Sequence, residues 1–259
     1  MKLSLKEIHD IEAEMLREVA AICERHGILY FLAYGSLIGA VRHKGPIPWD
    51  PDVDILVPHH HFERFIKLVR AELSEKFFLD YFDVNPEYPA LMPRIALKGY
   101  SSYTLHLDVF RLVGVPANTE ERETYRKKAR HYRNIFLYKK SNARYFVNYS
   151  WKRKYYRMLM KMVYAPISIS SLIKKYNSLC GKYAYDDSEM VLNINGGYEK
   201  KEFIQRSFFG NGILMHYLDF QVRVPENYHE FLEHFYGDYM QFPPKEQQVA
   251  LEEYEIREL

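Results

Sequence analysis

Three aspartates at alternate positions, Asp50, Asp52 and Asp54, constrain this 259-residue chain more than any other feature. They stand just before and inside the apolar run Val53–Val57, which Pro58 closes. Residues two apart on a strand point to the same face, so the run predicts a strand that presents two neighbouring carboxylates. Crowded carboxylates repel one another unless a positive group lies between them. The pattern therefore predicts a site for a hard divalent cation, Mg²⁺ or Mn²⁺.

A glycine–serine pair precedes the aspartates and follows the β-rich run 28–34. Gly35 would let the backbone approach a phosphate closely, and Ser36 at the start of a short helix could offer its hydroxyl and amide N–H to the same anion. Each part alone is usually a turn or a solvated loop. In the order strand, Gly-Ser, helix, basic loop and Asp-x-Asp strand, they predict a catalytic site that binds a nucleotide.

The basic loop contains Arg42, His43 and Lys44, between the glycine–serine pair and the aspartates. Cations at this place could neutralise a diphosphate or stabilise the charge of a leaving nucleotide. We therefore group these three residues with Gly35 and Ser36 as the residues expected to bind the phosphates of a nucleotide.

The stretch from Tyr34 to Ile55 resembles the LicD family of the nucleotidyltransferase superfamily. A family-typical Trp-Asp-Asp-Asp-Ile-Asp corresponds to Trp49-Asp50-Pro51-Asp52-Val53-Asp54 here, so a proline replaces one candidate ligand and the alternate carboxylates remain. The segments His106–Phe110 and Tyr236–Met240, the latter followed by Pro243-Pro244, also resemble family segments. The resemblance touches most of the chain and thins over residues 113 to 190.

The resemblance implies further roles for acidic residues. Asp108, on a neighbouring strand, is expected to complete the metal site with Asp52 and Asp54, or to take the proton from the attacking hydroxyl. Asp50 is expected to assist them. The segment Tyr236–Met240 is expected near the active site.

The rest of the sequence predicts alternating helices and strands. Ser4 and Glu7 form a capping-box pattern that begins a helix ending at Gly27, and helices are also expected over 61–73 and 228–236. Extended segments are expected over 77–82, 95–97 and 104–112. The expected fold class is α/β of the α+β type: a nucleotidyltransferase, polymerase-β-like core with a small mixed sheet, a basic helical insertion and a helical C-terminal cap. We place the catalytic core at 1–115, the insertion at 116–190 and the cap, which completes the active site, at 191–259.

The middle of the chain is strongly basic. Residues 124–185 contain sixteen Lys or Arg, many aromatic residues and no Asp or Glu, and they predict basic helices over 125–133, 151–162 and 172–176. This region could bind nucleic acid, an anionic membrane or an anionic acceptor, or it could simply pack its aromatic residues inward and leave its cations solvated. The net charge of only +2 speaks against specific nucleic acid binding. Residues 151–162 suit a peripheral amphipathic helix at an anionic membrane.

The sequence also bears on location. The N-terminus lacks the apolar core of a signal peptide, and no run of about 18 apolar residues occurs. Cys23 and Cys180 have neither metal-ligand spacing nor a disulfide framework. We expect a cytoplasmic protein with peripheral contact at the inner face of the plasma membrane.

The LicD resemblance implies a metal-dependent transfer of phosphocholine from CDP-choline to a sugar hydroxyl. The acceptor would be a cell-surface glycan precursor of teichoic acid, lipopolysaccharide or capsule, carried on a lipid. One alternative is transfer of ribitol, glycerol or another polyol phosphate from a CDP-linked donor. Alternatives of another class are a nucleic-acid-directed nucleotidyltransferase and a non-catalytic binding protein.

Overall fold

The computed structural model describes residues 1–140, 150–251 and 253–258. Its α-helices are α1 Leu5–His26, α2 Tyr34–Ile38, α3 His59–Glu72, α4 Thr119–Lys139, α5 Trp151–Val163, α6 Ile169–Cys180 and α7 Tyr228–Tyr236. Its strands are β1 Lys2–Leu3, β2 Phe31–Leu32, β3 Val53–Pro58, β4 Phe77–Asp80, β5 Arg94–Leu97, β6 His106–Gly114, β7 Met190–Asn193, β8 Phe203–Gln205, β9 Ile213–Tyr217, β10 Phe220–Val224 and β11 Tyr254–Glu255. Shorter helical turns are η1 Gly39–His43, η3 Glu199–Glu202, η4 Arg206–Phe208 and η5 Lys245–Gln247.

Helix α1 begins and ends where its sequence predicts. The Ser4 side chain accepts from the Glu7 amide, and the Glu7 side chain accepts from the Ser4 amide, so two backbone donors at the helix start are satisfied. At the other end Gly27 adopts a left-handed conformation with φ of 60°, which glycine enters at little cost. The expected helix is confirmed.

The main sheet is mixed, as expected. Its strands follow the order β2-β3-β6-β5-β4, and β7 pairs with β6 and carries β8 on its other side. Strands β3 and β6 are parallel, and their register places Asp54 opposite Asp108. Directly opposed residues on neighbouring strands lie on the same face of a sheet. The sheet therefore brings the two predicted carboxylates side by side.

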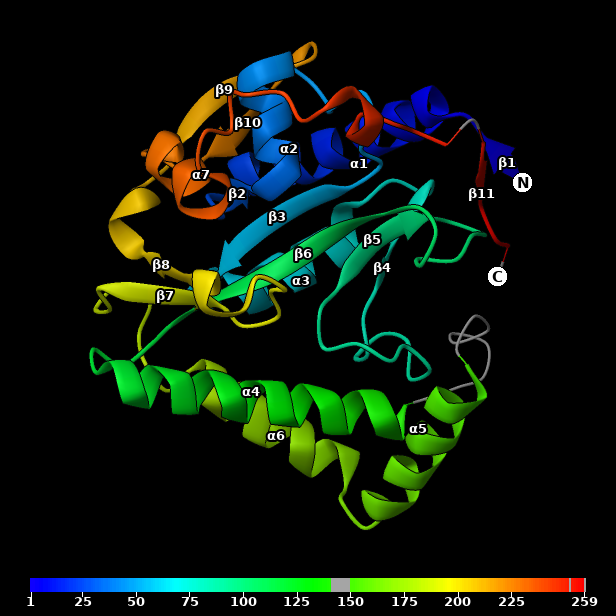
Figure 1. Cartoon of the computed structure of the whole chain (residues 1–259), viewed down its shortest axis with the longest axis vertical. Helices are drawn as coiled ribbons and strands as arrows, with labels where there is room; N and C mark the ends of the chain where they lie inside the picture. The colour runs from blue at the N-terminus through cyan, green and yellow to red at the C-terminus, as the bar shows by residue number, and fades with distance from the viewer. Residues whose placement is uncertain (141–149, 252, 259) are drawn as a thin grey trace.

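Helices pack against the sheet, and three of them form a separate layer (Figure 1). Helices α1 and α3 pack against each other and against β6, and their apolar faces join the main core. Helices α4 and α6 form a second core with the ends of β6 and β7, built around Tyr125, Phe136 and Tyr176. In Figure 1 the layer of α4, α5 and α6 lies on the opposite side of the sheet region from α2 and α7. The architecture confirms the α+β class.

Two expectations need correction. The strand expected over 28–34 is short, because β2 pairs with β3 only at Phe31 and Leu32, and Tyr34 already begins α2 with φ of 50°. The C-terminal region is also not a helical cap. Within residues 191–251 and 253–258, α7 is the only α-helix, while β7 and β8 belong to the main sheet, β9 and β10 form a hairpin and β11 pairs with β1. These short strands depend on partners far away in sequence, which local patterns do not reveal.

Among the residues that the structure describes, no helix combines the length and the apolar character needed to cross a membrane.

Candidate active site

Ser36 ties α2 to the strand that carries the aspartates. Its buried hydroxyl donates to the Asp52 carbonyl oxygen at 3.2 Å and accepts from the Asp54 amide at 2.9 Å. Backbone groups at the start of a β-strand need hydrogen-bond partners, and the Ser36 side chain is the partner of a carbonyl and an amide there. The hydroxyl of Ser36 thus fixes the backbone at both aspartates, and its predicted contact with a phosphate stays a prediction.

Gly35 lets Asp50 approach the helix. A Cβ atom at Gly35 would lie 2.7 Å from the Asp50 Oδ2 atom, so a larger residue would displace that carboxylate. His9 on α1 holds the same residue from the other side, with its Nε2 atom 2.8 Å from the Asp50 carbonyl oxygen. Asp50 is thus positioned by two separate segments although it lies in a loop before Pro51.

Burial and mutual repulsion perturb the acidic cluster. Burial and the charge of Asp52 raise the pKa of Asp50 to about 6. Burial, followed by the charges of Asp108, Asp52 and Asp50, raises the pKa of Asp54 well above its usual value. Strongly perturbed carboxyl groups that share a cleft are typical of functional sites.

Asp108 has a different environment from the other aspartates. Its Oδ1 atom accepts from Arg94 Nε at 2.8 Å and lies 3.3 Å from His106 Nε2. Burial acts to raise the pKa of Asp108, but the His106 hydrogen bond and the Arg94 charge outweigh it and lower the pKa below the usual value. Asp108 therefore neighbours Asp54 on the sheet while its charge is compensated by its own partners.

The carboxylate oxygens of the cleft suit a hard cation that binds few protein ligands. No group of three His, Cys, Asp or Glu side chains within residues 1–140, 150–251 and 253–258 is arranged to enclose a metal ion. Mg²⁺ usually takes only one or two protein carboxylates and completes its shell with water and substrate phosphates. The repulsion that raises the pKa of Asp54 is the kind that a cation between carboxylates relieves. Asp52 and Asp54 fit such a site, and a third ligand from Asp108 remains a prediction.

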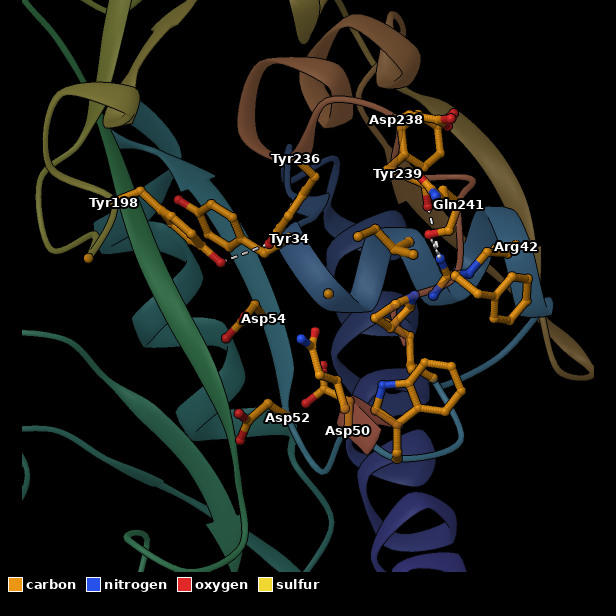
Figure 2. Close-up of a pocket in the computed structure, with 18 of the residues that line it drawn as sticks. Tyr34, Arg42, Asp50, Asp52, Asp54, Tyr198, Tyr236, Asp238, Tyr239 and Gln241 are labelled. Atoms are coloured by element: carbon orange, nitrogen blue, oxygen red, sulfur yellow. Dashed lines mark hydrogen bonds between the residues drawn. The ribbon is translucent and has the colours of Figure 1, made fainter. Parts of the chain in front are cut away.

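The aspartates form one end of a cavity of about 620 Å³ (Figure 2). Figure 2 shows Tyr34, Tyr198 and Tyr236 along one side and Arg42, Tyr239 and Gln241 along the other. Asp238, Phe242, Pro243 and Pro244 add to the wall. The C-terminal segment that the family resemblance placed near the site therefore lines it.

A buried hydrogen-bond network holds the aromatic side of this cavity. The Tyr34 hydroxyl donates to Glu202 Oε2 at 2.7 Å and accepts from Asn193 Nδ2 at 2.7 Å. The other carboxylate oxygen of Glu202 accepts from the Tyr198 amide at 3.0 Å, and the Tyr34 and Tyr198 rings stack 5.5 Å apart. The network locks α2 to the loop after β7, so the wall is preformed.

The predicted cationic loop divides into different roles. The Arg42 guanidinium lines the cavity, where its Nη1 atom donates to the Tyr239 carbonyl at 2.9 Å and its carbon lies 4.4 Å from the centre of the Phe242 ring. His43 accepts from Arg42 Nε and contacts Trp49 edge-on. Lys44 is exposed, and its Nζ atom donates to the Val41 carbonyl, so it does not line the cavity. The structure brings Gly35, Arg42, Asp50, Asp52 and Asp54 to the cavity wall, whereas Ser36, His43, Lys44 and Asp108 do not line the cavity.

Sequence reasoning missed several residues of the site. Glu12 on α1 is almost fully buried, has an Oε2 atom without a hydrogen-bond partner, and its pKa is raised by burial and by the charges of Asp52, Asp50 and Asp54. An acid at the same helical spacing as the buried residues Ile8, Met15 and Val19 was a readable signal. His9, Asn193, Tyr198 and Glu202 gave no comparable signal, because only the folded chain brings them to the site.

Comparison with known families gives a match that includes the stretch with the aspartates. The family model described as LicD/FKTN/FKRP, nucleotidyltransferase domain, matches residues 27–168, more than half of the chain and the whole stretch with the aspartates. The chain belongs to this family, and it is a phosphotransferase enzyme.

Individual relatives of the chain are phosphotransferases of two kinds. The chain is 30% identical over 262 residues to the lipopolysaccharide cholinephosphotransferase LicD of Haemophilus influenzae, and the match covers 95% of both chains. It is 50% identical over 42 residues to the ribitol 5-phosphate transferase FKRP of Homo sapiens and of Mus musculus, a match that covers 16% of this chain and 8% of each relative. The long match covers nearly all of both chains, whereas the short ones are local.

Proposed function

We propose that this enzyme transfers phosphocholine from CDP-choline to a sugar hydroxyl of a cell-surface glycan precursor. The observation that carries the proposal is the cavity, which combines carboxylates at one end with an aromatic wall along one side. The end-to-end similarity to a lipopolysaccharide cholinephosphotransferase supports the same group. A mixed sheet with Asp54 and Asp108 on adjacent parallel strands, preceded by the Gly35-Ser36 turn, supports a nucleotidyltransferase-like core.

The residues of the cavity have distinct tasks in this proposal. Asp52 and Asp54 would hold Mg²⁺ or Mn²⁺, which when bound supplies positive charge to the donor diphosphate. Arg42, at the opposite side of the cavity, offers a second positive charge to the same phosphates. Tyr198 and Tyr236 line the cavity, and their aromatic rings would attract a quaternary ammonium group there.

Asp50 is the carboxylate best suited to accept the proton of the acceptor hydroxyl. A general base works best when its pKa lies near the working pH, and the pKa of Asp50 is raised to about 6. The lowered pKa of Asp108 and its bond to Arg94 suit it less as a base and more as a group that orients its neighbours. The acceptor oxygen would then attack the phosphorus atom and CMP would leave.

A second candidate donor group is ribitol phosphate. The observation in its favour is the local match of 50% identity to the ribitol 5-phosphate transferase FKRP. A polyol would use hydrogen bonds from the cavity rather than aromatic faces. Under either proposal a lipid-carried acceptor would place the reaction at the cytoplasmic face of a membrane.

Incubation of the purified chain with CDP-choline, CDP-ribitol and CDP-glycerol, with and without Mg²⁺, tests these proposals. CMP release and a donor-induced rise in melting temperature are expected for CDP-choline, and release should require the cation. Tyr198→Leu should weaken CDP-choline binding more than CDP-glycerol binding, because only choline uses the ring face. A preference for CDP-ribitol that survives this substitution would refute the choline assignment and support the polyol.

A further inference from the structure

Helix α5 presents an apolar stripe to solvent. Trp151, Tyr155, Met158 and Met162 are 72%, 61%, 57% and 60% exposed, and none of the thirteen residues of α5 is buried. Their spacing of four, three and four residues places them on one line of a helix with about 3.6 residues per turn. We call these four residues the α5 stripe. Large apolar side chains gathered on one exposed helix face mark an interaction surface.

The opposite face of α5 anchors the helix to the molecule. The Tyr156 ring lies 6.0 Å from the Tyr138 ring of α4, and Arg157 Nη2 donates to the Leu137 carbonyl at 3.4 Å. Met160, which lies opposite the stripe on the helix, is half-buried. The α5 stripe therefore points away from the body, as the position of α5 at the edge of the helical layer in Figure 1 allows.

Positively charged side chains lie beside the α5 stripe, and they favour a negatively charged partner. Lys152 and Lys154 are exposed beside Trp151, and residues 124–185 contain no acidic residue. A second copy docking through this face would bring cations against cations, which is unfavourable. An anionic lipid surface instead offers headgroup phosphates to the lysines and an interfacial layer that favours Trp, Tyr and other apolar side chains.

The same helical layer carries further basic side chains. Lys128 on α4 and Lys174, Lys175 and Lys182 on or just after α6 line a groove of about 520 Å³. Charges that lie within about 10 Å of a membrane surface contribute to attraction at ordinary ionic strength. The groove thus adds to the preference of the layer for an anionic surface.

We infer that α5 docks the enzyme on anionic lipid, with the α5 stripe inserted among the headgroups and Lys152 and Lys154 beside their phosphates. The convex face of a single helix, with apolar residues between cations, is the shape and chemistry of an interfacial amphipathic helix. Docking of this kind does not depend on which group the active site transfers.

Co-sedimentation of the whole chain with vesicles tests the inference. Binding is expected to phosphatidylcholine vesicles that contain phosphatidylglycerol, and to fall steeply with added salt and without the anionic lipid. The triple variant Trp151→Ser, Tyr155→Ser, Met158→Ser should lower the partition coefficient at least about tenfold. Lys152→Gln with Lys154→Gln should lower it about fivefold or more per cation. All of these side chains are exposed, so circular dichroism should show an unchanged fold.

A matched control is Val249→Ser with Leu251→Ser, which removes two equally exposed apolar side chains outside α5 and should leave binding unchanged. Trp151 can also serve as a reporter, because the chain has only two tryptophans and Trp49→Phe leaves it alone. Its fluorescence should shift to shorter wavelength on anionic vesicles.

Three results would overturn the inference. They are absence of binding to anionic vesicles at low salt, binding that the stripe variant and the control reduce equally, and a dimer or a complex with an acidic protein that requires the stripe while vesicles do not bind. A thermal shift by CDP-choline in the stripe variant equal to that of the unaltered chain separates a failure of docking from a failure of the proposed chemistry.

Discussion

At the residue scale, the acidic groups of the cleft are held against one another by the backbone. Asp50 and Asp54 line the cavity, and Glu12 on α1 is buried. Burial raises the pKa of all three, the charge of Asp50 adds to the rise at Asp54, and the charges of Asp52, Asp50 and Asp54 add to the rise at Glu12. The fold maintains this arrangement through Ser36 and His9, which fix the backbone at Asp52, Asp54 and Asp50. The buried carboxylates lower the stability of the folded chain, and they give the cleft an affinity for positive charge.

The raised pKa of Asp50 predicts a pH-dependent stability. In the folded chain the pKa is about 6, above the ordinary value of 3.8, so the folded state binds the proton more tightly and loses stability as the pH rises from about 4 to about 6. Asp50→Asn should stabilise the metal-free protein at pH 7 by on the order of 1 to 2 kcal/mol, after allowance for solvent screening. The gain should shrink towards pH 4, and urea unfolding at both pH values measures it. An equal gain at both values would contradict the assignment.

Asp52 carries the sharpest catalytic prediction. Asp52→Asn removes a charge at nearly constant shape, so turnover should fall by about a thousandfold or more while the melting temperature changes little. CMP release from the donor measures the loss. The exposed Asp187→Asn is the matched control and should keep full activity. Substantial activity in the Asp52 variant would remove this residue from the cation site.

At the element scale, α2 and β3 act as one unit because the Ser36 side chain joins them. Helix α2 has only five residues and continues into η1, so it has little stability of its own. The Ser36 hydroxyl, which donates to the Asp52 carbonyl and accepts from the Asp54 amide, supplies a connection that the short β2–β3 pairing alone does not. Movement of α2 would therefore move both aspartates.

Ser36→Ala tests this connection. Loss of the hydroxyl leaves the Asp54 amide without its partner, which should cost about 1 to 3 kcal/mol of stability. If Ser36 positions β3, kcat should fall while the KM for the donor changes little. If Ser36 binds the donor phosphate directly, the KM should rise instead. Ser207→Ala, at an exposed serine, provides the comparison.

At the scale of the whole molecule, the first and last strands of the structure pair with each other. Strand β11 pairs with β1, the Met1 amino group donates to the Ile256 carbonyl at 3.0 Å, and the Ile256 amide donates back at 2.8 Å. Between α7 and β11 the chain passes along the active-site cavity, where Tyr239 and Gln241 bind Arg42. The cavity wall is thus tethered at both ends, by α7 and by the pairing of the termini (Figure 1).

Ile256→Ala tests how much this closure contributes. The Ile256 side chain is buried in the main core, and its truncation should cost about 2 to 4 kcal/mol in urea unfolding. Val249→Ala, at an exposed residue nearby in sequence, should cost far less. Equal effects of both changes would show that the C-terminal strand adds little to stability.

The sequence by itself determined the features that depend on near neighbours. The capping box at Ser4 and the stop at Gly27 set α1. The alternate spacing of Asp52 and Asp54 predicted neighbouring carboxylates, which lie directly before and inside β3. The basic helices α4, α5 and α6 were readable because helix formation follows local spacing. The order of Gly35, Arg42 and the aspartates likewise predicted residues that meet at one cavity, the candidate active site.

Only the tertiary structure decided the features that distant segments create. It paired Asp108 with Arg94 and His106, directed the Ser36 hydroxyl to β3, buried Glu12 behind the cleft and built the cavity wall from residues after β7. It also turned the expected helical cap into strands, because β7 pairs with the distant β6 and β11 pairs with the distant β1. Local spacing fixes which residues can act together along one element, whereas burial and strand pairing between remote segments fix which of them meet.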